Sequence, residues 1–166
     1  IVVGHQVDEQ RLADESAESM VQRLAIAKAQ SALQQVVGKS PRPILGADTI
    51  VVVGGEILGK PKDQADGLRM LGRLSGKTHR VLTAVAVVDH ERVLVRLNSN
   101  KVTFDEISPE LCHQYWQTGE PVDKAGAYAV QGMAGLFIKH IEGSFSGIMG
   151  LPLYETYTLL AEFSGR

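Results

Sequence analysis

The spacing of hydrophobic residues switches between helical and strand periodicity along this chain. The first helical stretch is capped by Asp14 or Ser16, runs to about residue 37 and ends at Gly38. A second helical stretch begins after Asp63 and ends at Ser75-Gly76. The apolar face of the first stretch is formed by Ala17, Met20, Leu24 and Ala27.

Between these two helices the pattern is that of a pair of strands. The β-branched run of residues 50–53 is followed by Gly54-Gly55 and then by the short apolar segment 56–58. Two glycines between apolar runs are typical of a two-residue hairpin turn. The sequence therefore predicts a β-hairpin here.

The second half of the chain continues the alternation. Residues 78–88 and 92–104 form two long strand patterns, and LFIKHI, residues 136–141, is a shorter one. A third helix is predicted from Ser108, and a last amphipathic helix follows Pro152. Together these elements predict an α/β fold in which helices flank a twisted mixed sheet of at least four strands.

Composition limits the classes to which the protein can belong. With 166 residues, 44% of them hydrophobic, the chain is long enough for one domain over residues 1–166. Seventeen basic and 19 acidic residues give a net charge of −2, and no basic run suggests a nucleic-acid polymer as partner. No apolar run has the length of a membrane-spanning helix, so we expect a cytoplasmic protein with no membrane partner. The single cysteine, Cys112, excludes an internal disulfide and favours a buried structural thiol.

Polar residues interrupt the apolar run that leads into the predicted hairpin. Asp48 and Thr49 lie where a buried strand would carry valine, and Lys60-Pro61-Lys62 follows the return strand. A carboxylate buried in such a run costs on the order of several kcal/mol unless a metal, a cation or hydrogen bonds compensate it. A functional acid with phosphate-binding lysines and a satisfied acid at a surface turn are equally good interpretations of these residues alone.

A second polar cluster lies in the segment Gly119 to Gly132. Asp123 and Lys124 are adjacent, and the glycines of this segment let the backbone approach a ligand closely. Gln131 carries an amide that both donates and accepts hydrogen bonds and could recognise a planar polar ring. The alternative for Asp123 and Lys124 is a surface ion pair of little energetic value. The alternative for Gln131 is an exposed turn glutamine, which without further context is the better interpretation.

Four segments together resemble one protein family. In chain order they are GADTIVVVGGEILGKPKD, LSGKTHRVLTAV, GEPVDKAGAYAVQG and GSFSGIMGLPLYET. Their sequences and order are similar to those of the Maf family of nucleoside triphosphate pyrophosphatases, from about residue 9 to residue 157. The resemblance implies an elongated, two-lobed fold like that of the inosine triphosphate pyrophosphatases, with a central cleft. It also implies a homodimer and a house-cleaning or septum-related role.

The resemblance implies hydrolysis of a nucleoside triphosphate to the monophosphate and pyrophosphate, with Mg²⁺ or Mn²⁺ as cofactor. Asp48 would be the proton acceptor that activates water, and Glu9 and Asp48 would hold the metal. Lys28 and Lys60 match lysines that hold the triphosphate. The expected binding partner of the protein is therefore its nucleoside triphosphate substrate. These roles are chemically consistent, because attack on the α phosphorus builds negative charge that cations must stabilise.

Within the family, the motif ADT together with a segment ending in QG resembles the branch that acts on dTTP and UTP. Thr49 and Gln131 would then select the pyrimidine base. The alternatives are the branch that acts on 7-methyl-GTP, a nucleotide-binding regulatory module of the same fold without turnover, and an unrelated metal-dependent phosphohydrolase that releases orthophosphate.

The chain departs from the family pattern in two places. The family begins with a strand and a Ser-Pro-Arg-Arg loop whose arginine contacts the substrate, and this sequence has no such motif before Ile1. We therefore expect an N-terminally truncated chain with weak or no activity if the protein starts at Ile1. Ala129-Val130 replaces a frequent glycine-isoleucine pair, a change that leaves the expected role of Gln131 intact.

Overall fold

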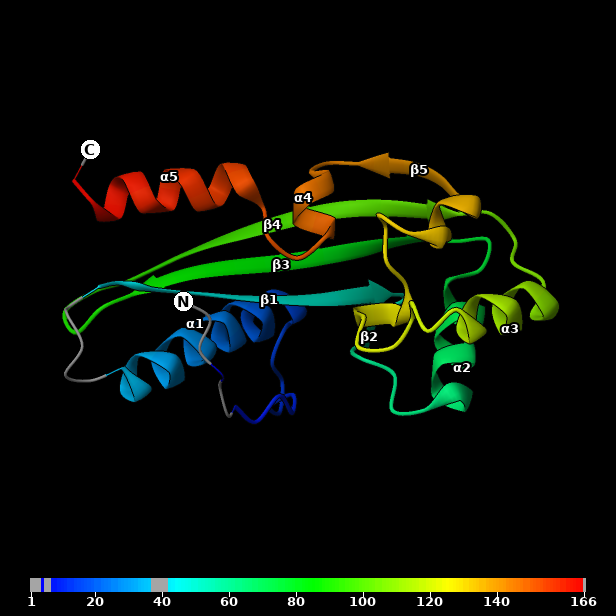
Figure 1. Ribbon diagram of the computed structural model, residues 1–166, viewed down its shortest axis with the longest axis horizontal. Coiled ribbons are helices and arrows are strands. Elements are labelled where there is room, and N and C mark those ends of the chain that lie inside the picture. Colours follow the sequence, from blue (N-terminus) through cyan, green and yellow to red (C-terminus); the bar gives the residue numbers. More distant parts are fainter. Residues whose placement is uncertain (1–3, 5–6, 37–41, 166) are drawn as a thin grey trace.

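A five-stranded sheet forms the centre of the computed structural model, which describes residue 4 and residues 7–36 and 42–165 (Figure 1). The strand order is β2-β1-β3-β4-β5. Every strand pair among the described residues is antiparallel, so the predicted mixed sheet is wrong in this respect. Tight turns reverse the chain between β1 and β2 and between β3 and β4. The strands are β1 (Ile44–Val53), β2 (Glu56–Leu58), β3 (Thr78–Val88), β4 (Val93–Phe104) and β5 (Ile138–Glu142).

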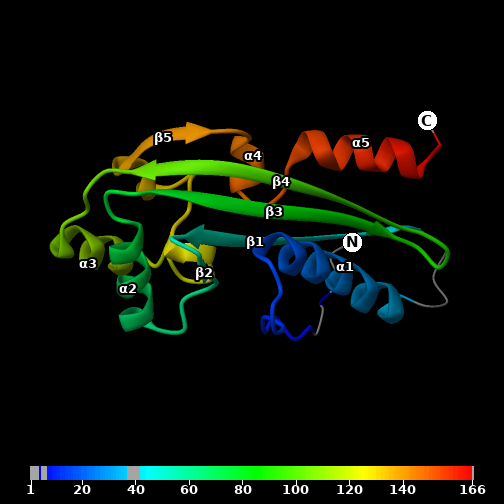
Figure 2. The same ribbon diagram turned by 180° about the vertical axis from the view of Figure 1, so that it is seen from behind.

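Helices flank this sheet, as the sequence predicted, and the molecule is elongated (Figures 1 and 2). Helices α1 and α5 cover opposite faces at one end of the long strands, and α2 and α3 gather at the other end, which gives two lobes. No helix in the described ranges is long and apolar enough to cross a membrane. The helices are α1 (Ala17–Gln35), α2 (Gln64–Leu74), α3 (Pro109–Gln117), α4 (Phe145–Ile148) and α5 (Leu153–Phe163), with 3-10 turns η1 (Ala125–Ala127) and η2 (Met133–Leu136).

Capping residues start the helices at the positions that the sequence predicted. The side chains of Ser16, Asp63 and Ser108 each accept a hydrogen bond from a backbone N–H three residues later. Asp14, the alternative cap for α1, lies in the preceding turn. The expected helix end at Gly38 lies outside the described residues. The short helix α4 and the two 3-10 turns were not predicted.

The hairpin between β1 and β2 is confirmed. Gly54 and Gly55 both have positive φ, 55° and 81°, the backbone that a tight hairpin turn requires. Pairing with β2 covers only Val51 to Val53 of the ten residues of β1. The first seven residues of β1 therefore extend past the end of β2.

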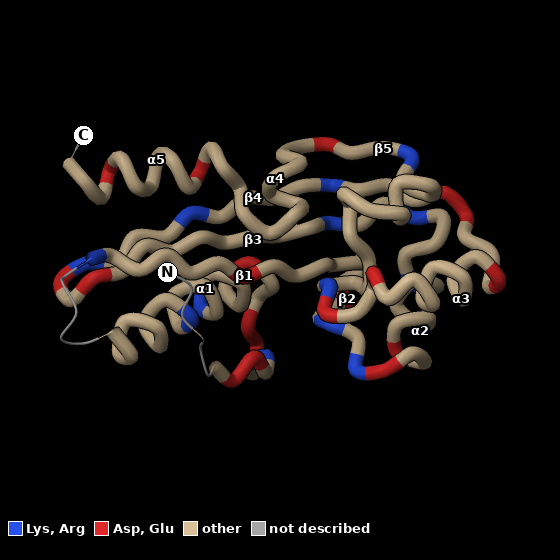
Figure 3. The backbone as a smooth tube through the Cα atoms, viewed as in Figure 1, with Lys and Arg blue, Asp and Glu red and all other residues tan. Residues whose placement is uncertain are grey.

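Successive side chains of the sheet point to opposite faces and enter separate hydrophobic cores. On one face, α1 packs Val21, Ala25 and Ala29 against the even-numbered apolar residues of β1 and β3. On the other face, α5 packs on the far half of β3, and a larger core built around Phe104 fills the lobe with α2 and α3. Figure 3 shows acidic and basic positions interspersed along the backbone that surrounds these cores.

A glycine sets the distance between α1 and the sheet. A Cβ atom at Gly46 would lie 2.5 Å from the carbonyl oxygen of Ala25 and 2.8 Å from the backbone nitrogen of Ala29. Such distances are shorter than any van der Waals contact, so only glycine allows this approach. The close packing also brings Lys28, the residue just before Ala29 on α1, beside Asp48 of β1.

We predict that Gly46→Ala lowers the free energy of unfolding by about 1–3 kcal/mol, because the added methyl group overpacks the α1–β1 contact. Urea titration followed by circular dichroism measures this change. Gly72→Ala is the matched control, since a Cβ atom at this position on α2 would meet nothing within 4 Å beyond its chain neighbours and the local helix backbone. It should stabilise the protein by up to about 1 kcal/mol, the difference in helix propensity. Equal effects of the two substitutions would contradict the packing argument.

Candidate active site

Two adjoining cavities lie along the part of β1 that does not pair with β2. The first has a volume of about 290 Å³ and the second about 340 Å³. Neighbouring strand residues point to opposite faces, yet Asp48 and Thr49 line both cavities, because β1 here extends past the end of β2. Lys28 and Lys60 also line both, so the cavities form one continuous site.

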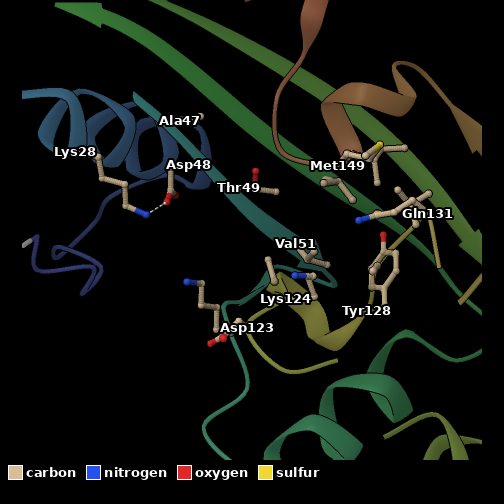
Figure 4. A pocket seen from close by; sticks show the side chains of 16 residues that line it. Lys28, Ala47, Asp48, Thr49, Val51, Asp123, Lys124, Tyr128, Gln131 and Met149 are labelled. Atoms are coloured by element: carbon tan, nitrogen blue, oxygen red, sulfur yellow. Dashed lines mark hydrogen bonds and ion pairs between the residues drawn. The ribbon is translucent and has the colours of Figure 1, made fainter. Parts of the chain in front are cut away.

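The structure brings together all six residues for which the sequence predicted a role. Glu9 lines only the second cavity and Gln131 only the first, so these two lie at opposite ends of the site. Figure 4 shows Lys28 and Asp48 on one side, Gln131 on the other, and Thr49 between them. The remaining predicted residue is Lys60.

A buried ion pair occupies the centre of the site. The ammonium Nζ of Lys28 lies 2.5 Å from Asp48 Oδ1 and 2.7 Å from Glu9 Oε1. The side chain of Asp48 is only 7% exposed, whereas that of Glu9 is 46% exposed. Lys28 therefore bridges one buried and one accessible carboxylate. The second carboxylate oxygen of Asp48, Oδ2, is buried and has no hydrogen-bond partner among the described residues.

Burial and charge oppose each other in this pair. Burial raises the pKa of Asp48, and the hydrogen bond and charge of Lys28 offset only part of that effect. Burial disfavours the charged form of Lys28 as well, but hydrogen bonds to Asp48 and Glu9 outweigh it and raise the pKa of Lys28. Asp48 is thus a better proton acceptor than an ordinary carboxylate, held beside a lysine that stays charged.

Loop contacts fix the second lysine and the polar cluster of the first cavity. The N–H of Gly126 donates to the carbonyl of Gly59 at 2.9 Å, which ties η1 to the end of the hairpin just before Lys60. Asp123 and Lys124, at the start of this loop, line the first cavity. By contrast, Lys62 lines neither of the two cavities, and its backbone N–H donates to Asp66.

Gln131 stands on a loop that is tied to α3. The hydroxyl of Tyr115 donates to Glu120 Oε1 at 2.5 Å and accepts the N–H of Ala129 at 3.1 Å. Glu120 Oε2 accepts the N–H of Met133 at 2.9 Å. These contacts hold both ends of the segment around Gln131, whose exposed side chain points into the first cavity (Figure 4).

The two carboxylates of the site, Glu9 and Asp48, suit a divalent metal that takes its other ligands from substrate phosphates and water. No cluster of three or more metal-ligating side chains occurs in the part of the chain that the structure describes. Glu9 and Asp48 can supply two carboxylates, and Mg²⁺ is commonly bound by one or two carboxylates together with substrate phosphates and water. The unsatisfied Oδ2 of Asp48 fits such a ligand role.

Several residues of the site were not singled out from the sequence. Tyr128 and Met149 line the first cavity, and Thr83 hydrogen-bonds to Thr49 beneath it. Of these three residues, Thr83 alone stands out in the sequence, because it is a polar residue within the apolar strand VLTAVAVV. Cys112 lies outside both cavities and is buried, which raises the pKa of its thiol, in agreement with the predicted structural role.

A buried histidine supports the wall of the first cavity. The Nε2 atom of His79 lies 2.9 Å from the hydroxyl of Tyr128, and the ring packs edge-on against Phe104. Burial lowers the pKa of His79 to about 4. The imidazole is therefore neutral at pH 7, and its protonation is coupled to the packing of Tyr128.

Comparison with known proteins places the chain among close relatives. The family described as "Maf-like protein" matches residues 1–163. A protein of Alkalilimnicola ehrlichii named "dTTP/UTP pyrophosphatase" is 51% identical over 95% of this chain and 79% of its own length. Proteins of the same name from Pseudoalteromonas translucida and Escherichia coli are 49% and 48% identical, over 94% and 99% of this chain and 82% and 81% of their own lengths.

We predict that stability falls as the pH is lowered from above 6.5 toward 4, because His79 binds a proton more readily in the unfolded chain than in the folded one. The difference in pKa corresponds to a loss of about 3 kcal/mol. Urea unfolding of wild type and His79→Gln between pH 7 and pH 4.5 measures this contribution, which the variant should lack. His90→Gln, at an exposed turn, is the control and should keep the wild-type slope.

Proposed function

This chain belongs to the Maf family, and we propose that it is a nucleoside triphosphate pyrophosphatase that hydrolyses dTTP and UTP to the monophosphate and pyrophosphate. The relatives that carry the name of this activity are about half identical to the chain over nearly its whole length. The observation that carries the proposal is the buried Asp48–Lys28 pair, set between an accessible carboxylate and a polar base-sized cavity.

In the proposed reaction, Asp48 accepts a proton from the attacking water. The water oxygen forms a bond to the α phosphorus, the bond between this phosphorus and the bridging oxygen breaks, and pyrophosphate leaves with the electron pair. A general base works best when its pKa is shifted toward the working pH, and burial shifts Asp48 in this direction. Oδ1 is held by Lys28, and the buried Oδ2 has no hydrogen-bond partner among the described residues, so either this proton or the metal would take up its unused lone pairs.

The lysines of the site would hold the triphosphate. Lys28 and Lys60 line both cavities, so a triphosphate bound there would have both ammonium groups near it to stabilise the negative charge that grows on its oxygens and on the leaving pyrophosphate. Lys28 also keeps Asp48 oriented through its hydrogen bond. Lys124, in the first cavity, adds a third cation near the same path.

Glu9 and Asp48 would hold a divalent cation, Mg²⁺ or Mn²⁺. When bound, such an ion neutralises phosphate charge and orients the triphosphate. Lys28 bridges the same two carboxylates, so its ammonium group would have to share or yield one of these contacts.

The pyrimidine base would lie at the opposite end of the site. Thr49 and Gln131 present a hydroxyl and an amide to the first cavity, whose volume of about 290 Å³ limits the size of the ring that enters. Backbone ties on both sides of Gln131 keep its loop in place, which makes base selection by this side chain geometrically reasonable.

A panel of nucleoside triphosphates, assayed on the full-length protein with Mg²⁺ and with Mn²⁺, tests the proposal. We expect pyrophosphate and the monophosphate from dTTP and UTP, and much slower release from ATP, GTP and 7-methyl-GTP. Orthophosphate as the first product would identify a different phosphohydrolase. Nucleotide binding without any product would instead favour a regulatory module of the same fold.

We predict that Asp48→Asn lowers kcat by at least about 100-fold, the contribution typical of a general base, while the protein remains folded. Steady-state kinetics and circular dichroism measure the two properties separately. A variant with the full wild-type rate would remove Asp48 from the proposed chemistry.

We further predict that Lys60→Ala lowers kcat/KM by roughly tenfold or more, because a charge-assisted contact with phosphate is lost. Lys62→Ala is the matched control, since it lies two residues away and lines neither cavity. It should keep kcat/KM near the wild-type value. Equal losses in both variants would show that general positive charge, and not the placement of Lys60, matters.

A further inference from the structure

A row of polar side chains crosses the sheet on the face that carries α4. Thr49 of β1 lies directly opposite Thr83 of β3, and Thr83 lies directly opposite Asn98 of β4. The residues on this face of β3 to either side of Thr83 are buried valines, Val81 and Val85. Thr83 is itself fully buried, so its hydroxyl must be satisfied by the protein.

The hydrogen bonds of Thr83 have only one consistent direction. Its Oγ1 donates to the carbonyl of Gly147 at 2.7 Å and lies 2.9 Å from Oγ1 of Thr49. A carbonyl can only accept, and a threonine hydroxyl has a single hydrogen to give. That hydrogen goes to Gly147, so Thr49 must donate its own hydrogen to Thr83. Thr49 therefore offers only lone pairs to the first cavity, which it lines.

The position of the Gly147 carbonyl is fixed by its surroundings. The N–H of Ser144, which caps α4, donates to Asn100 Oδ1 at 2.6 Å. A Cβ atom at Gly147 would lie 2.0 Å from Asn98 Oδ1, so α4 lies directly on the polar row. Because α4 is held in this way, the carbonyl stays beside Thr83 and the direction of the hydrogen bonds does not reverse.

This direction distinguishes the pyrimidine bases. Uracil and thymine carry an N–H donor at N3, whereas N3 of cytosine is an acceptor. The amide of Gln131 presents a donor or an acceptor according to its orientation, so it can satisfy the exocyclic group of either kind of base. Thr49 cannot adapt in this way while its hydrogen is used by Thr83. An acceptor facing cytosine N3 leaves two lone pairs opposed and both groups unpaired.

We infer that Thr83 is a positioning residue that makes Thr49 a pure hydrogen-bond acceptor, so that the site selects the N3–H of uracil or thymine against cytosine. The inference rests on the proposed function and adds to it the atom of the base that is recognised. Thr83 itself lines neither cavity.

The variant Thr83→Val tests the inference because it keeps the shape of the side chain and removes the hydroxyl. Thr49 then regains a hydrogen that it can donate to cytosine N3. The ratio of kcat/KM for UTP to kcat/KM for CTP should fall by roughly tenfold, the value of one hydrogen bond gained or lost. Thr83→Ser keeps the hydroxyl and should keep the wild-type ratio.

Thr78→Val provides the matched control. Thr78 and Thr103 form another directly opposed threonine pair on β3 and β4, with Oγ1 atoms 2.9 Å apart, but this pair is away from both cavities. Its removal should leave the UTP to CTP ratio unchanged. An unchanged ratio in folded Thr83→Val, or an equal fall in Thr78→Val, would overturn the inference.

Loss of the hydrogen bond to Gly147 can also prevent Thr83→Val from folding, so the wild-type protein supplies a second test. 3-Methyl-UTP lacks the N3–H, whereas 5-methyl-UTP carries the same added methyl group and keeps it. We expect the protein to hydrolyse 5-methyl-UTP and to reject 3-methyl-UTP by tenfold or more in kcat/KM. Equal hydrolysis of the two would overturn the inference alone. No pyrophosphate from UTP itself would overturn the proposed function, and the inference with it.

Discussion

The ion pair between Asp48 and Lys28 is the interaction on which the rest of the site depends. A carboxylate in the middle of a buried strand is tolerated because the ammonium group of Lys28 lies 2.5 Å away. That contact requires α1 to pack against β1 without an intervening side chain, which Gly46 allows. The fold thus places a buried carboxylate and its cationic partner on two elements that are in van der Waals contact. The same arrangement pairs Asp48 with Lys28 and, through burial, raises the pKa of Asp48.

The alternation of a β-strand explains how one site serves two chemical tasks. Asp48 points toward α1 and the lysines, and Thr49, one residue later, points toward α4 and the loop of Gln131. Two neighbouring residues normally belong to separate faces of a sheet. Here the short strand β2 stops at Leu58, opposite Val51, so the two faces meet around the uncovered part of β1. In the proposed reaction, the phosphate and the base would therefore contact consecutive residues of one strand.

Local signals made much of this architecture predictable from the sequence. The caps at Ser16, Asp63 and Ser108 and the hairpin at Gly54-Gly55 act within a few residues, so their patterns determine where elements begin and turn. Strand direction is not a local property, and for this reason the mixed sheet was predicted where the described pairs are antiparallel. Helix α4 has only four residues, and distant contacts such as Ser144 to Asn100 hold it, so no periodicity indicated it.

The same distinction separates the site residues that the sequence suggested from those it did not. Asp48 stood out because a carboxylate in an apolar run needs an explanation, whereas threonine is an ordinary residue in a strand. The significance of Thr83 depends on a carbonyl 64 residues later in the chain, which no motif around the strand contains. A hydroxyl acts as donor or acceptor according to its partners, so residue type alone does not decide what Thr49 recognises. In the proposed reaction, base selection would be a property of the row of hydrogen bonds from Gly147 through Thr83 to Thr49, which exists only in the folded protein.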